Sequence, residues 1–200
     1  MNEHPILFTP DNIRLIREER KWQTRRIIKP QPDSVHDGEP YWNIGGYRAW
    51  KFRGISDVFR MGTANPLKCP YGQVGDKLYI KEGVIVHKDG KTLAGYYMDG
   101  ARVTNLGEKR LTAMFMPKLF ARMWLEITEV RIERVQDIIE EDAIAEGIST
   151  SGREFTFNGG LHLSRTAKDS FAALWDSINK YKHPFENNDW VWCLSFKLIN

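Results

Sequence analysis

The stretch WLEITEVRI, residues Trp124–Ile132, alternates apolar and polar side chains over most of its length. This period of two is typical of a β-strand with one buried face. The same alternation recurs in Leu78–Lys81 and in Trp190–Leu198. The Asp-Gly pair within Lys88–Lys91 predicts a hairpin between the short runs on either side. We therefore expect several strands that are distant in sequence and pair with one another.

Two amphipathic segments predict helices beside these strands. Asp137–Gly147 has an acidic first half and ends on a glycine, and Thr166–Tyr181 carries its apolar residues on one face. A shorter helix is expected to begin at Asp11, as N-cap, and to end near Glu19 or Arg20. Strands with helices packed at the side predict an α+β fold, specifically a partly closed β-barrel with flanking helices.

Length and composition fit a single domain over residues 1–200, and 42% hydrophobic residues can supply its core. Within residues 33–66, aromatic residues alternate irregularly with Gly, Arg and Lys, which favours an insertion with short strands. Residues 148–163 form a second expected insertion. The net charge of +3 permits a polyanionic partner without requiring one.

Several classes of protein are not expected. Two distant cysteines, Cys69 and Cys193, do not make a disulfide framework, and the five histidines form no Cys/His cluster. We therefore expect no metal and no cofactor. The chain also lacks a secretory signal and an apolar run long enough to cross a bilayer. These features predict a cytoplasmic protein without a membrane partner.

The strongest local signal is the basic stretch REERKWQTRR, Arg17–Arg26. Guanidinium groups bind phosphate and an indole can stack on a base, so this composition favours single-stranded nucleic acid. We expect phosphate contacts from Arg20, Lys21, Arg25 and Arg26, base stacking on Trp22, and a polar substrate contact from Gln23. The alternative is a solvated helix end held by salt bridges.

Lys21 and Thr24 lie three residues apart, so they share a face on a helical turn but not on an ideal strand. A threonine hydroxyl needs an adjacent base to act as a nucleophile. A lysine can supply that base only if burial or neighbouring cations lower its pKa. Whether the two side chains can cooperate therefore depends on their position at the join between helix and strand.

Carboxylates can complete such a site. Glu82 follows the Leu78–Lys81 strand, where its side chain can face the same cleft, and Glu146 lies at the end of the acidic helix. Arg122 is a further candidate for a phosphate contact. The alternative for each of them is an ordinary exposed surface position.

Taken in chain order, these segments resemble the ASCH-domain proteins of the PUA-like superfamily. The similarity extends to the longer form of the family that is common in bacteriophage and prophage genomes. The similarity rests on the following segments: Ile6–Phe8, Arg20–Arg26, Pro30, Cys69–Gly72, Gly75–Glu82, Met116–Pro117, Glu140–Gly147 and Trp190–Trp192.

This resemblance implies a PUA-like barrel, an association with RNA and a bacterial, possibly phage-encoded, origin. A small bacterial member removes the acetyl group from N4-acetylcytidine with a Lys-x-x-Thr pair and a glutamate proton donor. These roles fall on Lys21, Thr24 and Glu146. The chain departs from the family motif at Glu19, where the family has glycine, and at Trp22, where it has threonine.

Three functions are therefore expected. The first is an RNA- or nucleoside-handling amidohydrolase that deacylates N4-acetylcytidine-like nucleosides. The second is a non-catalytic module that binds RNA or a modified base. The third is a phage accessory protein that acts through contacts with other proteins.

Overall fold

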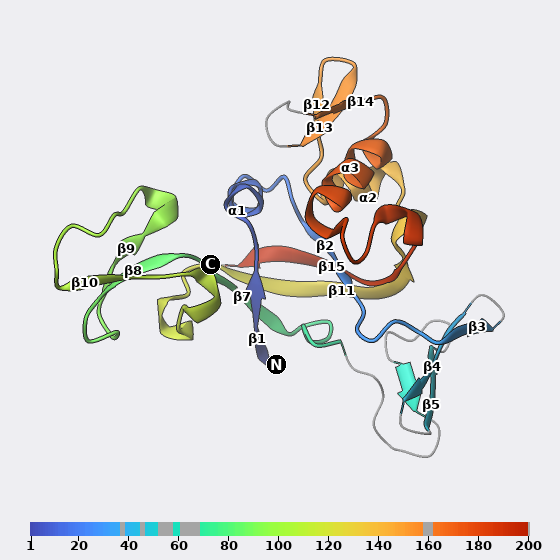
Figure 1. Ribbon diagram of the computed structural model, residues 1–200, viewed down its shortest axis with the longest axis horizontal. Coiled ribbons are helices and arrows are strands. Elements are labelled where there is room, and N and C mark those ends of the chain that lie inside the picture. The colour runs from blue at the N-terminus through green and yellow to red at the C-terminus, as the bar shows by residue number, and fades with distance from the viewer. Residues whose placement is uncertain (37–38, 45–46, 52–57, 61–68, 158–161, 200) are drawn as a thin grey trace.

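The computed structural model describes residues 1–36, 39–44, 47–51, 58–60, 69–157 and 162–199. These residues form an α+β protein in which strands predominate (Figure 1). Four sheets occur in this part of the chain. No helix among these residues is long and apolar enough to span a bilayer.

The central sheet has the strand order β1-β7-β11-β15-β2. Its strands are β1 (Glu3–Leu7), β7 (Lys77–Lys81), β11 (Trp124–Arg134), β15 (Trp190–Ile199) and β2 (Gln23–Ile27). β1 is parallel to β7, and the other neighbours are antiparallel. The alternation in Trp124–Ile132 is confirmed as a strand. β1 and β2 are the outer strands, so the described strands do not close into a barrel.

One face of this sheet carries the main hydrophobic core. Leu78, Leu125, Ile127 and Leu194 are completely buried there. They occupy alternate positions of β7, β11 and β15, which is the pattern that directs apolar side chains to one side of a sheet. The burial of these residues explains why the alternating segments pair although they are far apart in sequence.

Three smaller sheets are antiparallel. The first has the order β10-β8-β9 and confirms the predicted hairpin, because β8 and β9 pair directly. The predicted insertions contain the other two, β3-β4-β5-β6 and β12-β13-β14. The strands are β8 (Val84–His87), β9 (Leu93–Tyr96), β10 (Glu108–Leu111), β3 (Ser34–His36), β4 (Glu39–Ile44), β5 (Tyr47–Lys51), β6 (Val58–Arg60), β12 (Ser149–Ser151), β13 (Glu154–Phe157) and β14 (His162–Ser164).

The helices are α1 (Pro10–Arg17), α2 (Glu140–Ala145) and α3 (Ala167–Asn179). The predicted N-cap of α1 is wrong: the side chain of Thr9, not Asp11, accepts a hydrogen bond from the Asn12 amide. α1 also ends earlier than predicted, because Glu19 adopts a left-handed conformation with φ 55°. α2 is shorter than predicted because Asp137 ends a separate 3-10 turn, Val135–Asp137, and Ile139 is still extended before the helix begins at Glu140.

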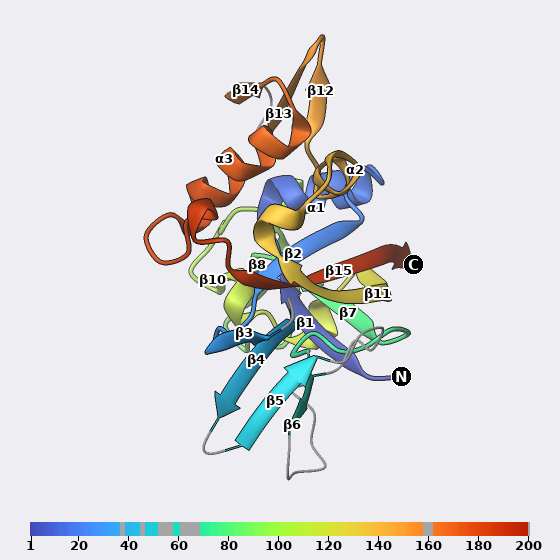
Figure 2. The same ribbon diagram turned by 90° about the vertical axis from the view of Figure 1, so that its right-hand side faces the viewer.

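The helices and the first insertion lie at opposite ends of the molecule. In both views α2, α3 and the β12–β14 sheet are on one side of the central sheet, and β3–β5 are on the other (Figures 1 and 2). Phe171 and Trp175 of α3 join a second apolar cluster with Val191 of β15. The cavity described below is lined by residues of α3 and by both faces of the outer strand β2.

We expect Leu125→Ala to lower the free energy of unfolding by about 2–5 kcal/mol, because it removes a fully buried side chain from the middle of the sheet. Urea unfolding followed by circular dichroism measures this loss. Thr128→Ala, an exposed change in the same strand, should alter stability by less than about 0.5 kcal/mol. Equal losses in both variants would contradict the assigned core.

Candidate active site

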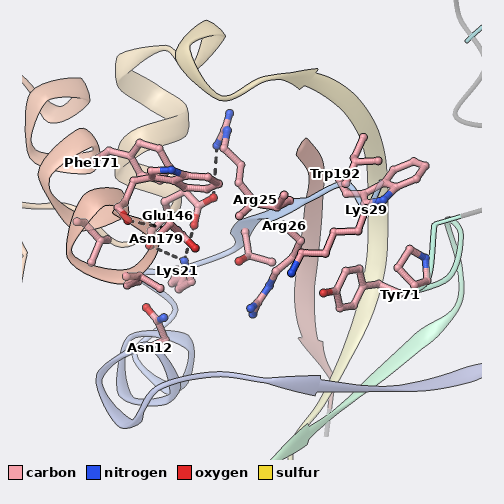
Figure 3. Close-up of a pocket in the computed structure, with 17 residues that line it drawn as sticks. Asn12, Lys21, Arg25, Arg26, Lys29, Tyr71, Glu146, Phe171, Asn179 and Trp192 are labelled. Carbon is pink, nitrogen blue, oxygen red and sulfur yellow. Dashed lines mark hydrogen bonds and ion pairs between the residues drawn. The ribbon is translucent and has the colours of Figure 1, made fainter. Parts of the chain in front are cut away.

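Lys21 and Thr24 lie on the two sides of the join between α1 and β2. The Lys21 amide donates to the Leu15 carbonyl at 3.2 Å, which fixes the turn after α1. Thr24 belongs to β2 and is opposite Leu194 of β15. Both residues line one cavity of about 460 Å³, and Glu146 lines it too (Figure 3). The break between helix and strand thus allows the two side chains to share a cavity.

The core of the site is a buried ion pair. Lys21 Nζ donates to Glu146 Oε2 at 2.7 Å and to the Glu146 carbonyl at 2.5 Å. Their side chains are only 2% and 6% exposed. A lysine has three N–H donors, so one is left for the cavity. The Thr24 hydroxyl makes no hydrogen bond within the described residues, and catalytic contacts often shorten only when substrate binds.

Gly147 allows Lys21 and Glu146 to approach each other. It has φ 102°, a backbone conformation that favours glycine. A Cβ atom at this position would lie 2.8 Å from the Leu15 side chain and 3.6 Å from Lys21 Cβ. The glycine after α2 is therefore required by the packing of α2 against the turn that carries Lys21.

Burial lowers the pKa of Lys21 below its ordinary value. The negative charge of Glu146 opposes this shift, and the positive charges of Arg26 and Arg25 add to it. Both conditions named for such a base, burial and neighbouring cations, thus act on Lys21. A lysine with a lowered pKa loses its proton more readily, as a general base must.

A charge network connects the site to the central sheet. Arg25, Cys193 and Arg131 lie side by side across β2, β15 and β11. Asp142 of α2 accepts hydrogen bonds from Arg25 at 2.8 Å and from Arg131 at 3.0 Å. Gln23 also donates to Asp142, at 3.1 Å. These contacts hold α2 against the sheet.

Arg25 also reaches the catalytic candidates directly. Its guanidinium pairs with Glu133 and lies 3.5 Å from Glu146 Oε1, and its side chain is completely buried. Gln23 accepts a further hydrogen bond from Arg25 at 2.6 Å. Arg25 is therefore placed to position Glu146, and it is not placed to bind a phosphate from solution as the sequence suggested. Gln23 supports Arg25 and does not line the cavity.

The cavity combines aromatic walls with cations. Tyr71, Phe171, Trp175 and Trp192 line it, together with Arg26 and Lys29 (Figure 3). The Arg26 guanidinium lies 5.1 Å from the Phe8 ring and 5.9 Å from the Tyr71 ring, and it donates to the Leu7 carbonyl. Aromatic faces beside cations suit a flat, polar ring such as a nucleobase.

Besides Gln23, four residues expected at the site lie outside this cavity. Arg20 pairs with Glu18 at 3.0 Å, and the Trp22 side chain is 46% exposed. Arg122 forms a two-pronged pair with the buried Glu82, at 2.9 and 2.8 Å. The expectation that Glu82 faces the same cleft is therefore not met, because a separate cluster with Arg122 neutralises its charge.

Sequence reasoning missed several residues of the site. From the sequence, Asp142 was interpreted only as part of the acidic half that favours the start of a helix. It lies four residues before Glu146, however, and faces the same side of α2. Tyr71 and Phe171 carry no local signal for a cavity. The partners Glu133 and Arg131 follow the strand alternation of β11, which does not indicate charge pairing across the sheet.

Within the described ranges, no group of three or more His, Cys, Asp or Glu side chains is arranged to hold a metal ion. Comparison of the chain with models of known protein families, with curated proteins and with solved structures gave no significant match.

Stability is expected to depend on pH through Lys21. Since its pKa is lowered in the folded protein, the unfolded chain keeps this proton to higher pH and binds more protons between the two pKa values. Stability should therefore rise with pH in this window, by up to about 1.4 kcal/mol per pH unit for one proton. Urea unfolding of the wild type and of Lys21→Met from pH 8 to 10.5 isolates this contribution.

In the difference between the two proteins, the other titrating groups cancel. The wild type should gain stability relative to Lys21→Met as the pH rises. A difference that stays constant over this range would show that Lys21 keeps its ordinary pKa, and one that falls would show that its pKa is raised.

Proposed function

We propose that this chain is an ASCH-type, PUA-like protein that hydrolyses the amide bond of an N-acylated, cytidine-like nucleoside. The observation that carries the proposal is the buried Lys21–Glu146 pair, which lines a single cavity with the Thr24 hydroxyl. Nucleophile, base and acid are thus available at one place. The segments that resemble the ASCH family occur in the family's order along the chain, which supports the assignment. A partly closed barrel, as in the PUA-like superfamily, is part of the same proposal.

The reaction proceeds through an ester on Thr24. Lys21 accepts the hydroxyl proton, Thr24 Oγ attacks the amide carbonyl, and Glu146 protonates the exocyclic amine as the C–N bond breaks. Water then attacks the acyl ester, which releases the carboxylic acid and restores the Thr24 hydroxyl. One amide bond is broken and one water is consumed.

The number of protons that the reaction requires favours direct proton exchange between Lys21 and Glu146. Attack requires a neutral Lys21 and a protonated Glu146, which together hold the same single proton as an ammonium–carboxylate pair. The 2.7 Å contact between Nζ and Oε2 provides a direct path for that proton. The lowered pKa of Lys21 reduces the cost of moving it.

The walls of the cavity favour a nucleobase as the substrate. Its volume of about 460 Å³ falls within the usual range of small-molecule sites, about 300–1,000 Å³. Tyr71 offers a partly buried aromatic ring, Trp192 lines the cavity but is only 2% exposed, and Lys29 is an exposed cation at the same cavity. An acylated base can insert between these surfaces with its amide directed to Lys21.

Purified protein should release cytidine from N4-acetylcytidine, as measured by chromatography. Lys21→Met and Glu146→Gln should each lower the rate by about 10²–10⁴-fold, because they remove the base and the acid. Thr24→Ala should abolish the covalent route, and Thr24→Ser should restore part of the activity because it keeps a hydroxyl.

Thr128→Ala is the matched control, since Thr128 is exposed and does not line the cavity. Its rate should equal that of the wild type. Release of cytidine that survives Thr24→Ala would refute the nucleophile, and no release by the wild type would refute the substrate.

A second candidate function is binding of RNA without catalysis. It is favoured by two exposed neighbours, Trp22 at 46% and the Arg20 side chain at 50% exposure. An exposed indole beside a guanidinium is suited to stacking on a base near a phosphate. Arg25 is buried and takes no part in this mode of RNA binding.

If this function holds, affinity for a short single-stranded RNA should fall steeply as salt is raised, because phosphate contacts release counterions. Fluorescence anisotropy measures the slope. Trp22→Ala should weaken binding about 5- to 100-fold, which corresponds to the loss of one stacked base. Tyr181→Ala, at a fully exposed ring on the far end of α3, serves as control. Affinity that is indifferent to salt and to Trp22→Ala would exclude this mode of binding.

A further inference from the structure

A second cavity adjoins the proposed active site. It has a volume of about 380 Å³ and shares Asn12, Glu146, Leu174 and Ile178 with the first cavity. Glu146 thus forms part of the boundary between the two.

The second cavity differs in chemistry from the first. Its lining contains two arginines, Arg14 and Arg20, and a group of hydroxyl side chains from the strands β12 and β13 and from the ends of α1 and α3. Thr150 and Ser151, both exposed, make no side-chain hydrogen bond within the described residues. Phe157 is the one aromatic side chain among the described residues that line it. The space is therefore suited to a hydrated, polar group more than to a base.

The two arginines are available to a ligand. Arg14 faces Asp11 at 3.5 Å, but both side chains are 57% exposed, and exposed pairs of this kind contribute little to stability. Arg20 donates to Ser149 of β12 and to Glu18, and it remains half exposed. Both guanidinium groups can exchange these contacts for stronger ones to a phosphate.

The acidic groups at this cavity do not prevent an anion from binding. Glu146 is already neutralised by Lys21 and approached by Arg25. Asp11 lines the cavity and faces Arg14, and Glu18 pairs with Arg20, so each arginine already has one carboxylate partner. Both of these ion pairs are exposed and therefore weak, so a phosphate can replace the carboxylates.

We propose that this second cavity binds the phosphate of the substrate, so that the acylated base is presented as part of a nucleotide and not as a free nucleoside. The proposal rests on the function proposed above for the adjoining cavity. The base occupies the aromatic cavity, the ribose passes Glu146, and the phosphate reaches Arg14 and Arg20. The phosphate can belong to a mononucleotide or to a strand of RNA.

Binding can be measured without any reaction. We expect isothermal titration calorimetry at low salt to give about tenfold tighter binding for cytidine 5′-monophosphate or the dinucleotide CpC than for cytidine, because arginine–phosphate contacts are charge-assisted. Arg14→Gln combined with Arg20→Gln should remove this gain and leave the affinity for cytidine unchanged. Tighter binding of the monophosphate alone would identify a terminal phosphate as the bound group. Tighter binding of CpC would identify the phosphate of an RNA strand.

The matched control combines Lys88→Gln with Arg102→Gln, which removes the same charge from exposed positions that line neither cavity. It should keep the full gain, and circular dichroism checks that both double variants fold. Equal affinity for cytidine and both phosphorylated compounds, or a gain that survives loss of Arg14 and Arg20, would overturn the proposal. Absence of binding by all three compounds would overturn it too.

The outcome separates the two proposals. Hydrolysis of N4-acetylcytidine without a phosphate gain supports the deacylase and refutes the phosphate subsite. A phosphate gain that depends on both arginines, in a protein that hydrolyses neither N4-acetylcytidine nor its 5′-monophosphate, supports the subsite and refutes the deacylase.

Discussion

Charged groups on a covered sheet face need partners, and in this protein the short helix α2 supplies them. Arg25 and Arg131 lie in register on the face that α2 covers, and Asp142 accepts hydrogen bonds from both. Burying a guanidinium without such a partner would cost several kcal/mol. When α2 docks, it therefore neutralises the arginines of the sheet. The same contact determines where Glu146 lies, because Glu146 is at the end of α2.

The same contacts explain why Lys21 and Glu146 meet. α2 is too short to be stable alone, so its place is determined by its tertiary contacts. Asp142 fixes one turn against the sheet, and Gly147 lets the next turn approach the segment after α1. The ion pair is then enclosed by protein on most sides, where its charges interact more strongly than they would in water.

Periodicity in the sequence was sufficient to predict the larger elements. The alternation in Trp124–Ile132 and the apolar face of Thr166–Tyr181 both correspond to elements of the structure, because each reflects burial of one side. The boundaries of α1 were less well predicted. Thr9 and Asp11 are both good capping residues, and the left-handed conformation of Glu19 has no signal in the sequence.

The site was predicted in part. Lys21, Thr24 and Glu146 were named and share a cavity, although 125 positions separate the two members of the ion pair and no spacing rule connects them. Arg25 was expected to contact phosphate, together with Arg20, Lys21 and Arg26. Its carboxylate partners come from β11 and α2, so only the folded chain reveals that this guanidinium is buried.

The pairing of β2 with β15 has a consequence for the order in which the protein is made. β2, which carries Thr24, is synthesised early, but its neighbour in the sheet is residues 190–199. A nascent chain therefore carries β2 without its partner until β15 has left the ribosome. Contacts of such long range fold slowly. During this interval Thr24 and its basic neighbours lie on a segment that is not paired in the sheet. The cavity forms only when β15 docks.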